Sequence, residues 1–233
     1  MTAYKFLLFV HGALGVLALV TYWIAALARK GSGPHKLAGK VYVLVMVALL
    51  VPAVPLSIRI GLKSPVFGAF FGYLLLITAT ALWQGWYAVR RKRDFAAYAG
   101  IGYRRLARAN IAGGAAVLAL GVAAMQPILI GFSAVGLLGG RGMLGVARRG
   151  PAQPRWWMEQ HLGAMIGCGV ATHIAFLLVG LPRLLPALSG PGLQTAAWLG
   201  PLVLATFARR WMGRRFLPAL PTPGSAGGVV AAG

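Results

Sequence analysis

The sequence is poor in acidic residues. Asp94 and Glu159 are the only acids among 233 residues, against 23 Lys and Arg, and only 11% of the chain is charged. A soluble domain needs a surface with both signs of charge on about a quarter of its residues, so the composition excludes an ordinary soluble protein. The shortage of carboxylates also argues against proton- or sodium-coupled transport, which relies on acids within the membrane.

Other absences narrow the possible functions. The single cysteine, Cys168, lies in an apolar run, which excludes an intrachain disulfide. No lysine lies deep in an apolar run, which excludes a retinal Schiff base. The chain also lacks a phosphate-binding glycine loop, a nucleophile elbow and a Cys-pair metal motif. The sequence therefore assigns no enzyme class.

Long hydrophobic runs dominate the chain, which is 59% hydrophobic with a mean hydropathy of +0.76. A helix needs about 20 apolar residues to cross the bilayer core. Five candidate spans are clear: Lys5–Leu27, Leu37–Ile58, Val66–Val89, Gln160–Leu181 and Leu193–Phe207. We therefore predict an all-α polytopic transmembrane bundle at residues 1–217. The Pro-, Gly- and Ala-rich residues 218–233 are predicted to be a disordered tail.

One apolar stretch, from Asn110 to Gly140, is too long for a single span, since it would run about 46 Å as one helix. Pro127 lies near its middle, and proline is tolerated at the first position of a helix. The stretch is therefore predicted to form two spans, Ala107–Met125 and Pro127–Val146. This division brings the total to about seven.

Positive charge predicts the orientation of these spans. With seven spans and the N-terminus outside, 19 of the 23 Lys and Arg lie on the cytoplasmic side, whereas six spans divide them twelve against eleven. The positive-inside rule favours seven spans in a bacterial inner membrane, with the C-terminus cytoplasmic. The basic residues lie in short breaks between apolar runs, which argues against nucleic-acid binding. A basic loop from Arg90 to Arg108 is expected to contact anionic lipid headgroups or an acidic partner protein.

Four histidines are the main candidates for chemistry. His11 and His173 are predicted at an outer depth, and His35 and His161 at an inner depth. Two such pairs would suit two bis-imidazole haems, and a single imidazole could hold the magnesium of a chlorophyll. Gly12 and its small neighbours leave room beside His11 for a flat macrocycle. Alternatively, these small residues only let helices pack closely.

The sixth predicted span carries a second pattern. His161, Met165, Cys168 and Thr172 follow the i, i+4, i+7, i+11 spacing of one helix face. Imidazole, thioether and thiol are ligands for a soft metal such as copper(I), although Met and Cys also serve as ordinary packing residues. A further alternative is an enzyme that acts on a lipid-soluble substrate with Glu159 and His161 as acid–base groups.

Two stretches resemble a known family. The first holds His11-Gly-Ala-Leu-Gly15, Arg29-Lys-Gly31, His35, Gly39, Tyr42 and Met46; the second holds Trp157, His161, Met165, Ala175-Phe176 and Pro201. Together they resemble the bacterial multi-helix membrane proteins of the domain of unknown function 2306. The resemblance implies a membrane helix bundle and candidate functional positions at His11, His35, His161 and Met165. The position of His173 is apolar in that family.

Two functions of different classes remain open. The leading hypothesis is a membrane redox component in which His11, His35 and His161 serve a bound porphyrin-type or metal cofactor, haem first and copper second. The rival is a non-catalytic accessory or scaffold subunit that packs through its glycine-rich helices against a larger membrane complex.

Overall fold

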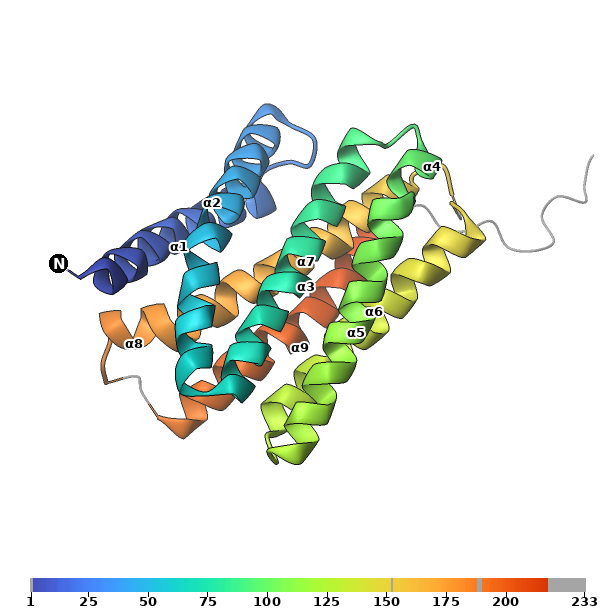
Figure 1. Ribbon diagram of the computed structural model, residues 1–233. Coiled ribbons are helices and arrows are strands. Elements are labelled where there is room, and N and C mark those ends of the chain that lie inside the picture. Colours follow the sequence, from blue (N-terminus) through green and yellow to red (C-terminus); the bar gives the residue numbers. More distant parts are fainter. Residues whose placement is uncertain (1, 152, 188–189, 218–233) are drawn as a thin grey trace, which may run out of the picture.

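The computed structural model describes residues 2–151, 153–187 and 190–217, and every regular element among them is helical (Figure 1). In chain order the elements are α1 (Ala3–Leu27), α2 (Gly33–Lys63), α3 (Pro65–Arg90), α4 (Phe95–Tyr98), α5 (Ile101–Ala123), α6 (Pro127–Arg149), α7 (Trp156–Ala175), a π-helical turn η1 (Phe176–Gly180), α8 (Leu181–Leu184) and α9 (Pro191–Phe216). The predicted all-α class is confirmed. The tail predicted at residues 218–233 lies outside the described residues.

Six of the helical segments are long and apolar enough to cross a membrane, and they match the first six predicted spans. The sixth of them is continuous from α7 through η1 to α8. The seventh long helix is α9, in which glutamine, glycine and proline dilute the apolar stretch before Arg209. The chain is therefore a multi-pass membrane protein built as a helix bundle.

The break between α5 and α6 lies where the sequence predicts it. Met125 has a φ of 52°, which turns the chain sharply, and Pro127 opens α6 immediately after Gln126. Proline suits this position because a first-turn N–H has no partner within the helix. The prediction of two helices in place of one long helix is confirmed.

The prediction that Arg90 to Arg108 form a loop is wrong, because most of this segment is helical. Instead, α3 continues to Arg90, Asp94 caps the short α4 by accepting a hydrogen bond from the Ala97 N–H at 2.8 Å, and α5 begins at Ile101, six residues before the predicted Ala107. Arginine is a good helix former. Its side chain also points back toward the start of its helix. The charges can therefore reach the membrane surface while the backbone stays helical.

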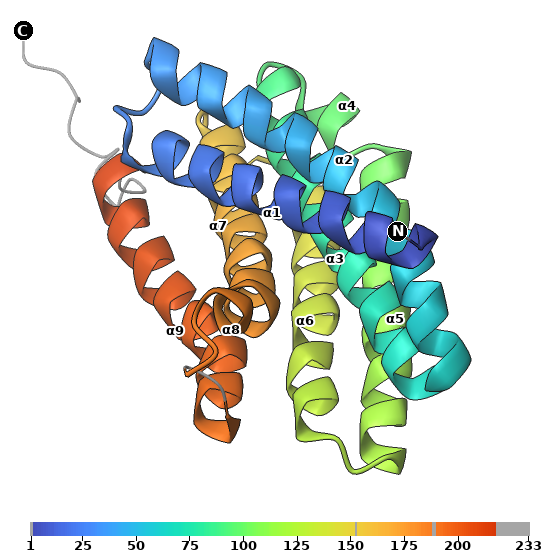
Figure 2. The ribbon, with the colours of Figure 1, turned by 90° about the vertical axis from the view of Figure 1, so that its left-hand side faces the viewer.

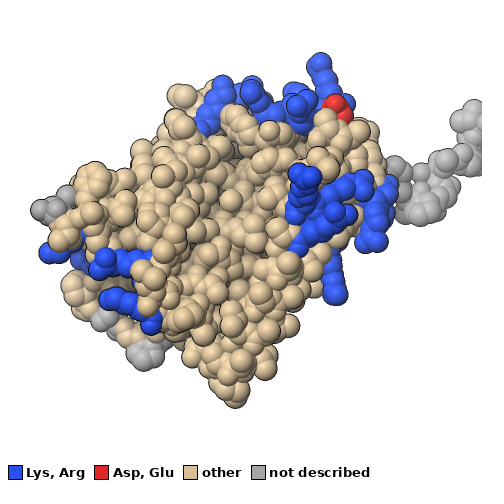
Figure 3. Space-filling model, viewed as in Figure 1, with Lys and Arg blue, Asp and Glu red and all other residues tan. Residues whose placement is uncertain are grey.

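The bundle has two unequal ends. One end, here called the arginine-rich end, holds the α1–α2, α3–α5 and α6–α7 connections and the last turn of α9 (Figure 1). The opposite end holds the N-terminus and the α2–α3 and α5–α6 turns. Basic side chains gather at both ends of the face shown in Figure 3, and a wide band without charge separates them. This division is expected of a protein whose middle lies in hydrocarbon.

Helices α1 and α2 form a pair on one side of the bundle, and the first half of α2 packs against α3 and α7. They lie side by side, and Figure 2 shows α1 running obliquely across α7 and α3. Pro52 and Pro55 lie inside α2, and the helix changes direction in that region (Figure 1). Proline bends a helix because it cannot donate to the carbonyl four residues earlier and its ring clashes there.

Helices α5 and α6 pack with their backbones in close contact. A methyl group added to Gly140 would lie 2.5 Å from the Ala107 carbonyl oxygen, and one added to Gly136 would lie 2.6 Å from the Asn110 oxygen. Small residues permit this close approach of the two helices. In a membrane the hydrophobic effect does not drive helices together, so van der Waals packing at such contacts does. The hairpin is joined to α3 by Asn110, whose amide donates to the Thr80 hydroxyl at 2.8 Å.

The Tyr73 hydroxyl of α3 is inserted into the hydrogen-bond ladder of α6. It donates to the Phe132 carbonyl at 2.9 Å and accepts from the Gly136 N–H at 2.7 Å. These two backbone groups are four residues apart and are each other's partners in a regular helix. Tyr73 therefore ties α3 to α6 through main-chain atoms.

Tyr73→Phe is expected to lower the free energy of unfolding by about 1 kcal/mol, because two hydrogen bonds are lost and the α6 ladder can recover one by closing. The measurement is the unfolding midpoint in a titration of mixed micelles with sodium dodecyl sulfate. Tyr4→Phe is the control, since Tyr4 is exposed on the first turn of α1. Equal midpoints for the two variants would contradict the bridging role of Tyr73.

Candidate functional site

His35 and His161 both lie at the arginine-rich end. His35 lies in the first turn of α2, held by the Ser32 cap and Pro34, and His161 lies near the start of α7. His161 lies within electrostatic range of the His35 imidazole and of the Lys30 ammonium. The fold thus brings together the two histidines that the sequence assigns to the same depth.

Both imidazoles hold the same orientation toward backbone. His35 Nδ1 lies 2.9 Å from the Ala25 carbonyl oxygen of α1, and His161 Nδ1 lies 2.9 Å from the Gly85 carbonyl oxygen of α3. A carbonyl only accepts hydrogen bonds, so each ring carries a proton on Nδ1, and in the neutral imidazole the Nε2 lone pair is then available. Neither Nε2 has a hydrogen-bond partner among the described residues. Metal-bound histidines characteristically make this Nδ1–H contact.

Gly85 makes room on α3 for the Met165 and Ala164 side chains of α7. A side chain at this position would meet the Met165 methyl group and the Ala164 side chain of α7. Because Gly85 has no side chain, α7 packs closely against α3. The His161 imidazole can then reach the backbone carbonyl of Gly85. Gly85 therefore explains how a histidine on one membrane helix contacts the main chain of another.

Lys30 is the third polar group near the pair. Its ammonium donates to the Ala25 carbonyl at 3.1 Å and also to the Ala26 carbonyl, which caps the end of α1. His35 therefore shares the Ala25 oxygen with Lys30. Partial burial lowers the pKa of Lys30 below its usual value. A cation at this position completes a group of one ammonium and two imidazoles with no acid among them.

His11 lies apart from this group, on the interface between α1 and α2. Its Nδ1 lies 3.2 Å from the Leu49 carbonyl oxygen, and its Nε2 also has no hydrogen-bond partner among the described residues. Gly15, one turn further on, packs against the Leu49 side chain. His11 therefore shares the orientation of His35 and His161 but stands alone.

The expected outer pair of His11 and His173 is not brought together. His173 Nδ1 lies 2.7 Å from the Gly169 oxygen of its own helix, and its Nε2 accepts a hydrogen bond from the Trp23 indole at 3.0 Å. Trp23 follows His11 by twelve residues, about 18 Å along α1. The reason is the oblique crossing of α1 over α7. The lone pair of His173 is already occupied by Trp23.

The face of α7 that carries Met165 and Cys168 points into the core. Cys168 is fully buried against Tyr42 and Met46, and Thr172 accepts or donates a 3.1 Å hydrogen bond with the Tyr42 hydroxyl. His161 and Cys168 are seven residues apart, about 10 Å along the helix, which is too far for one ion with ligands at about 2.3 Å. Within the described residues no three His, Cys, Asp or Glu side chains could hold a metal together.

Glu159 and His161 are not arranged as an acid–base pair. They lie two residues apart on α7, and residues at this spacing point to different sides of a helix. His161 instead directs Nδ1 to Gly85. The alternative of a lipid-active enzyme with this pair gains no support from the geometry.

An aromatic cluster beside His161 is a feature that the sequence analysis missed. Trp83 stacks on Tyr87 at 4.5 Å and lies 6.1 Å from the Tyr98 ring. The Tyr98 and Tyr103 hydroxyls both point to the Gln160 side-chain oxygen, at 3.4 and 3.5 Å. Aromatic rings near the end of a span ordinarily mark the membrane boundary, so the sequence alone does not single out this cluster. Their one distinguishing signal is the i, i+4 spacing of Trp83 and Tyr87.

Comparison of the chain with protein-family models, curated protein sequences and solved structures finds no match. The resemblance to the domain of unknown function 2306 stays a prediction from its motif residues. The function must accordingly be argued from the site itself.

Proposed function

We propose that the protein is a redox component of a bacterial inner membrane that holds a porphyrin-type cofactor, haem first, through His35 and His161. The N-terminus lies outside and the arginine-rich end is cytoplasmic. The observation that carries the proposal is the shared orientation of two imidazoles within electrostatic range of each other, each with Nδ1 on a helix carbonyl and Nε2 unpartnered among the described residues.

The number of ligands favours a porphyrin over a bare metal ion. Zinc and copper sites in proteins take three or four ligands from side chains. A haem iron takes four nitrogens from its own ring and needs only one or two axial ligands from the protein. Two imidazoles therefore suit a haem. In the described part of the chain no third carboxylate, thiol or imidazole joins them as a possible ligand.

The surrounding residues have definite roles in this proposal. The Ala25 and Gly85 carbonyls fix the orientation of the two rings and increase the basicity of Nε2. The positive charge of Lys30 lies within electrostatic range of His161 and would stabilise the reduced form of a cofactor bound there. A bound haem would supply one-electron transfer. His11 has the same ring orientation and is available to a second, separately bound group.

The experiment is a reduced minus oxidised absorption spectrum of the protein extracted gently from its native membrane, with metal analysis of the same sample. Sharp haem bands and about one iron per chain are expected. A featureless spectrum without stoichiometric metal would contradict the proposal. That result, with fixed co-purifying subunits, would favour the accessory-subunit function.

A further inference from the structure

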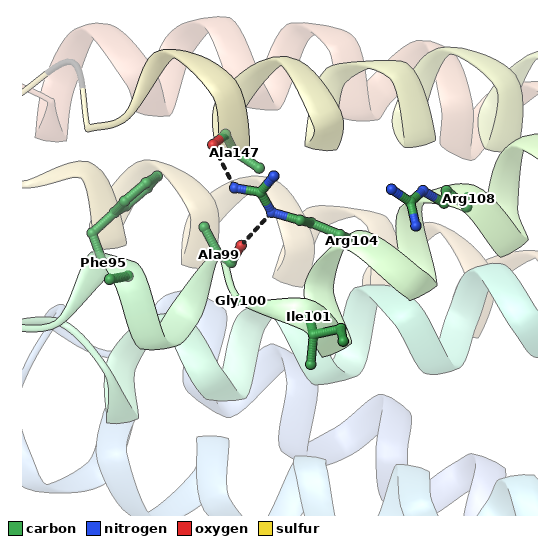
Figure 4. Close-up of a pocket in the computed structure, with 8 residues that line it drawn as sticks. Phe95, Ala99, Gly100, Ile101, Arg104, Arg108 and Ala147 are labelled. Carbon is green, nitrogen blue, oxygen red and sulfur yellow. Dashed lines mark hydrogen bonds between the residues drawn. The ribbon is translucent and has the colours of Figure 1, made fainter.

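An open groove lies at the arginine-rich end, and none of the four histidines lines it. It has a volume of about 570 Å³ and is formed by α4, the start of α5 and the end of α6. Its walls divide into an apolar part, with Phe95, Ala96 and Ile101, and a cationic part, with Arg104 and Arg108 (Figure 4). Lipid reaches such a groove from the side and water reaches it from the end.

The two arginines of the groove are held differently. Arg104 donates from Nε to the Ala99 carbonyl and from one terminal nitrogen to the Ala147 carbonyl, each at 3.2 Å. Arg104 thereby caps the last turn of α6. Its remaining terminal N–H groups take no part in these two hydrogen bonds and can donate to a ligand. Arg108 follows one turn later on the same side of α5, with no hydrogen-bond partner among the described residues. One guanidinium is fixed in place and the other is available.

The position of these groups relative to the membrane selects the ligand. α5 starts at the arginine-rich end, and helical side chains point toward the start of their helix. Figure 4 shows both guanidinium groups directed back along α5 toward Gly100. At a bundle end that lies at the membrane surface, this direction suits contact with lipid phosphates. The exposed Ile101 side chain and the partly buried Phe95 side chain offer apolar contacts beside them.

We propose that this groove binds one anionic phospholipid of the adjacent leaflet, with its phosphate between Arg104 and Arg108 and its glycerol and upper acyl carbons against Phe95 and Ile101. Guanidinium groups match phosphate oxygens in charge and in fork geometry. The chain has too few acids to compete for them, since Asp94 is occupied by the cap of α4. The proposal does not depend on the cofactor.

The test is native mass spectrometry of the full chain in detergent with added phosphatidylglycerol or phosphatidylcholine of identical acyl chains. The wild-type protein is expected to retain one phosphatidylglycerol in preference to phosphatidylcholine. Arg108→Gln is expected to lower this retention about fivefold, the usual effect of one basic residue at an anionic membrane surface. Arg105→Gln is the matched control, because Arg105 is an exposed arginine on α5 that does not line the groove.

A second pair of variants tests the groove without changing any charge. Ala96→Trp fills the groove and is expected to lower retention at least as much as Arg108→Gln, whereas Ala97→Trp, on the adjacent exposed position, leaves it unchanged. Equal retention of the two lipids by the wild type would overturn the proposal. Equal effects within either matched pair would overturn it too. Displacement of the lipid by millimolar inorganic phosphate would overturn it in favour of a site for free anions.

Discussion

Replacing His161 with alanine is expected to reduce cofactor occupancy to less than a tenth of the wild-type value. Substitutions that only disturb the partner of a metal ligand already cost about 10- to 100-fold in affinity, and this change removes the ligand itself. The measurement is the height of the haem bands per protein, with iron content on the same sample. His35→Ala is expected to weaken or shift the same bands, because His35 would be the second ligand and its Nε2 has no partner among the described residues.

The matched control for this experiment is His173→Ala. His173 lies on the same helix and is half-buried, but its Nε2 lone pair is bound to Trp23. It is expected to keep the bands. A His161→Gly variant supplemented with free imidazole guards against misfolding, because added imidazole should restore the bands only if the fold is intact. Identical spectra from His161→Ala and His173→Ala would rule out His161 as a ligand.

Gly140→Ala is expected to lower the free energy of unfolding by about 1–3 kcal/mol. The added methyl group would meet the Ala107 carbonyl oxygen at 2.5 Å and the Ile111 side chain at 2.7 Å. The first of these atoms belongs to helix backbone and cannot rotate away, so α5 and α6 must separate, and overpacking has this typical cost. The measurement is again the unfolding midpoint in mixed micelles.

The adjacent glycine provides the control. Gly139→Ala places its methyl group where no atom lies within 4 Å, so only the better helix propensity of alanine acts. It is expected to leave stability unchanged or slightly higher. A result in which both variants lose the same stability would mean that glycine content, and not the α5–α6 contact, determines the packing of this hairpin.

Hydropathy and charge predict most of the fold because each reports one local property. The break at Pro127 is confirmed because a long apolar run and a proline together define it. The predicted start of α5 at Ala107 is wrong because Arg104 and Arg105 were placed in a basic loop, although long side chains can keep their charge at the surface while their backbone stays helical. The N-terminus outside and the bacterial inner membrane stay predictions, because a helix bundle alone has no marked side.

The candidate site could be predicted only in part. Depth along a helix follows from residue number, which groups His35 with His161, and the two lie within electrostatic range of each other. The tilt of α1 does not follow from hydropathy, so the hydrogen bond between Trp23 and His173 could not be foreseen. The same is true of Gly85, whose role depends on which helix faces it. The ligand roles of Met165 and Cys168 stay predictions, although Cys168 lies in a closed core.

The prolines of α2 have a mechanical consequence for the paired histidines. Pro52 and Pro55 cannot donate to the carbonyls of Ala48 and Val51, so α2 lacks two backbone hydrogen bonds within one turn. Bending there costs less than elsewhere in α2. Because Tyr42, Val45 and Met46 pack the first half of α2 against α1, α3 and α7, the bend affects the second half and leaves His35 in place. A group bound to both imidazoles would add a further link between the first half of α2 and α7.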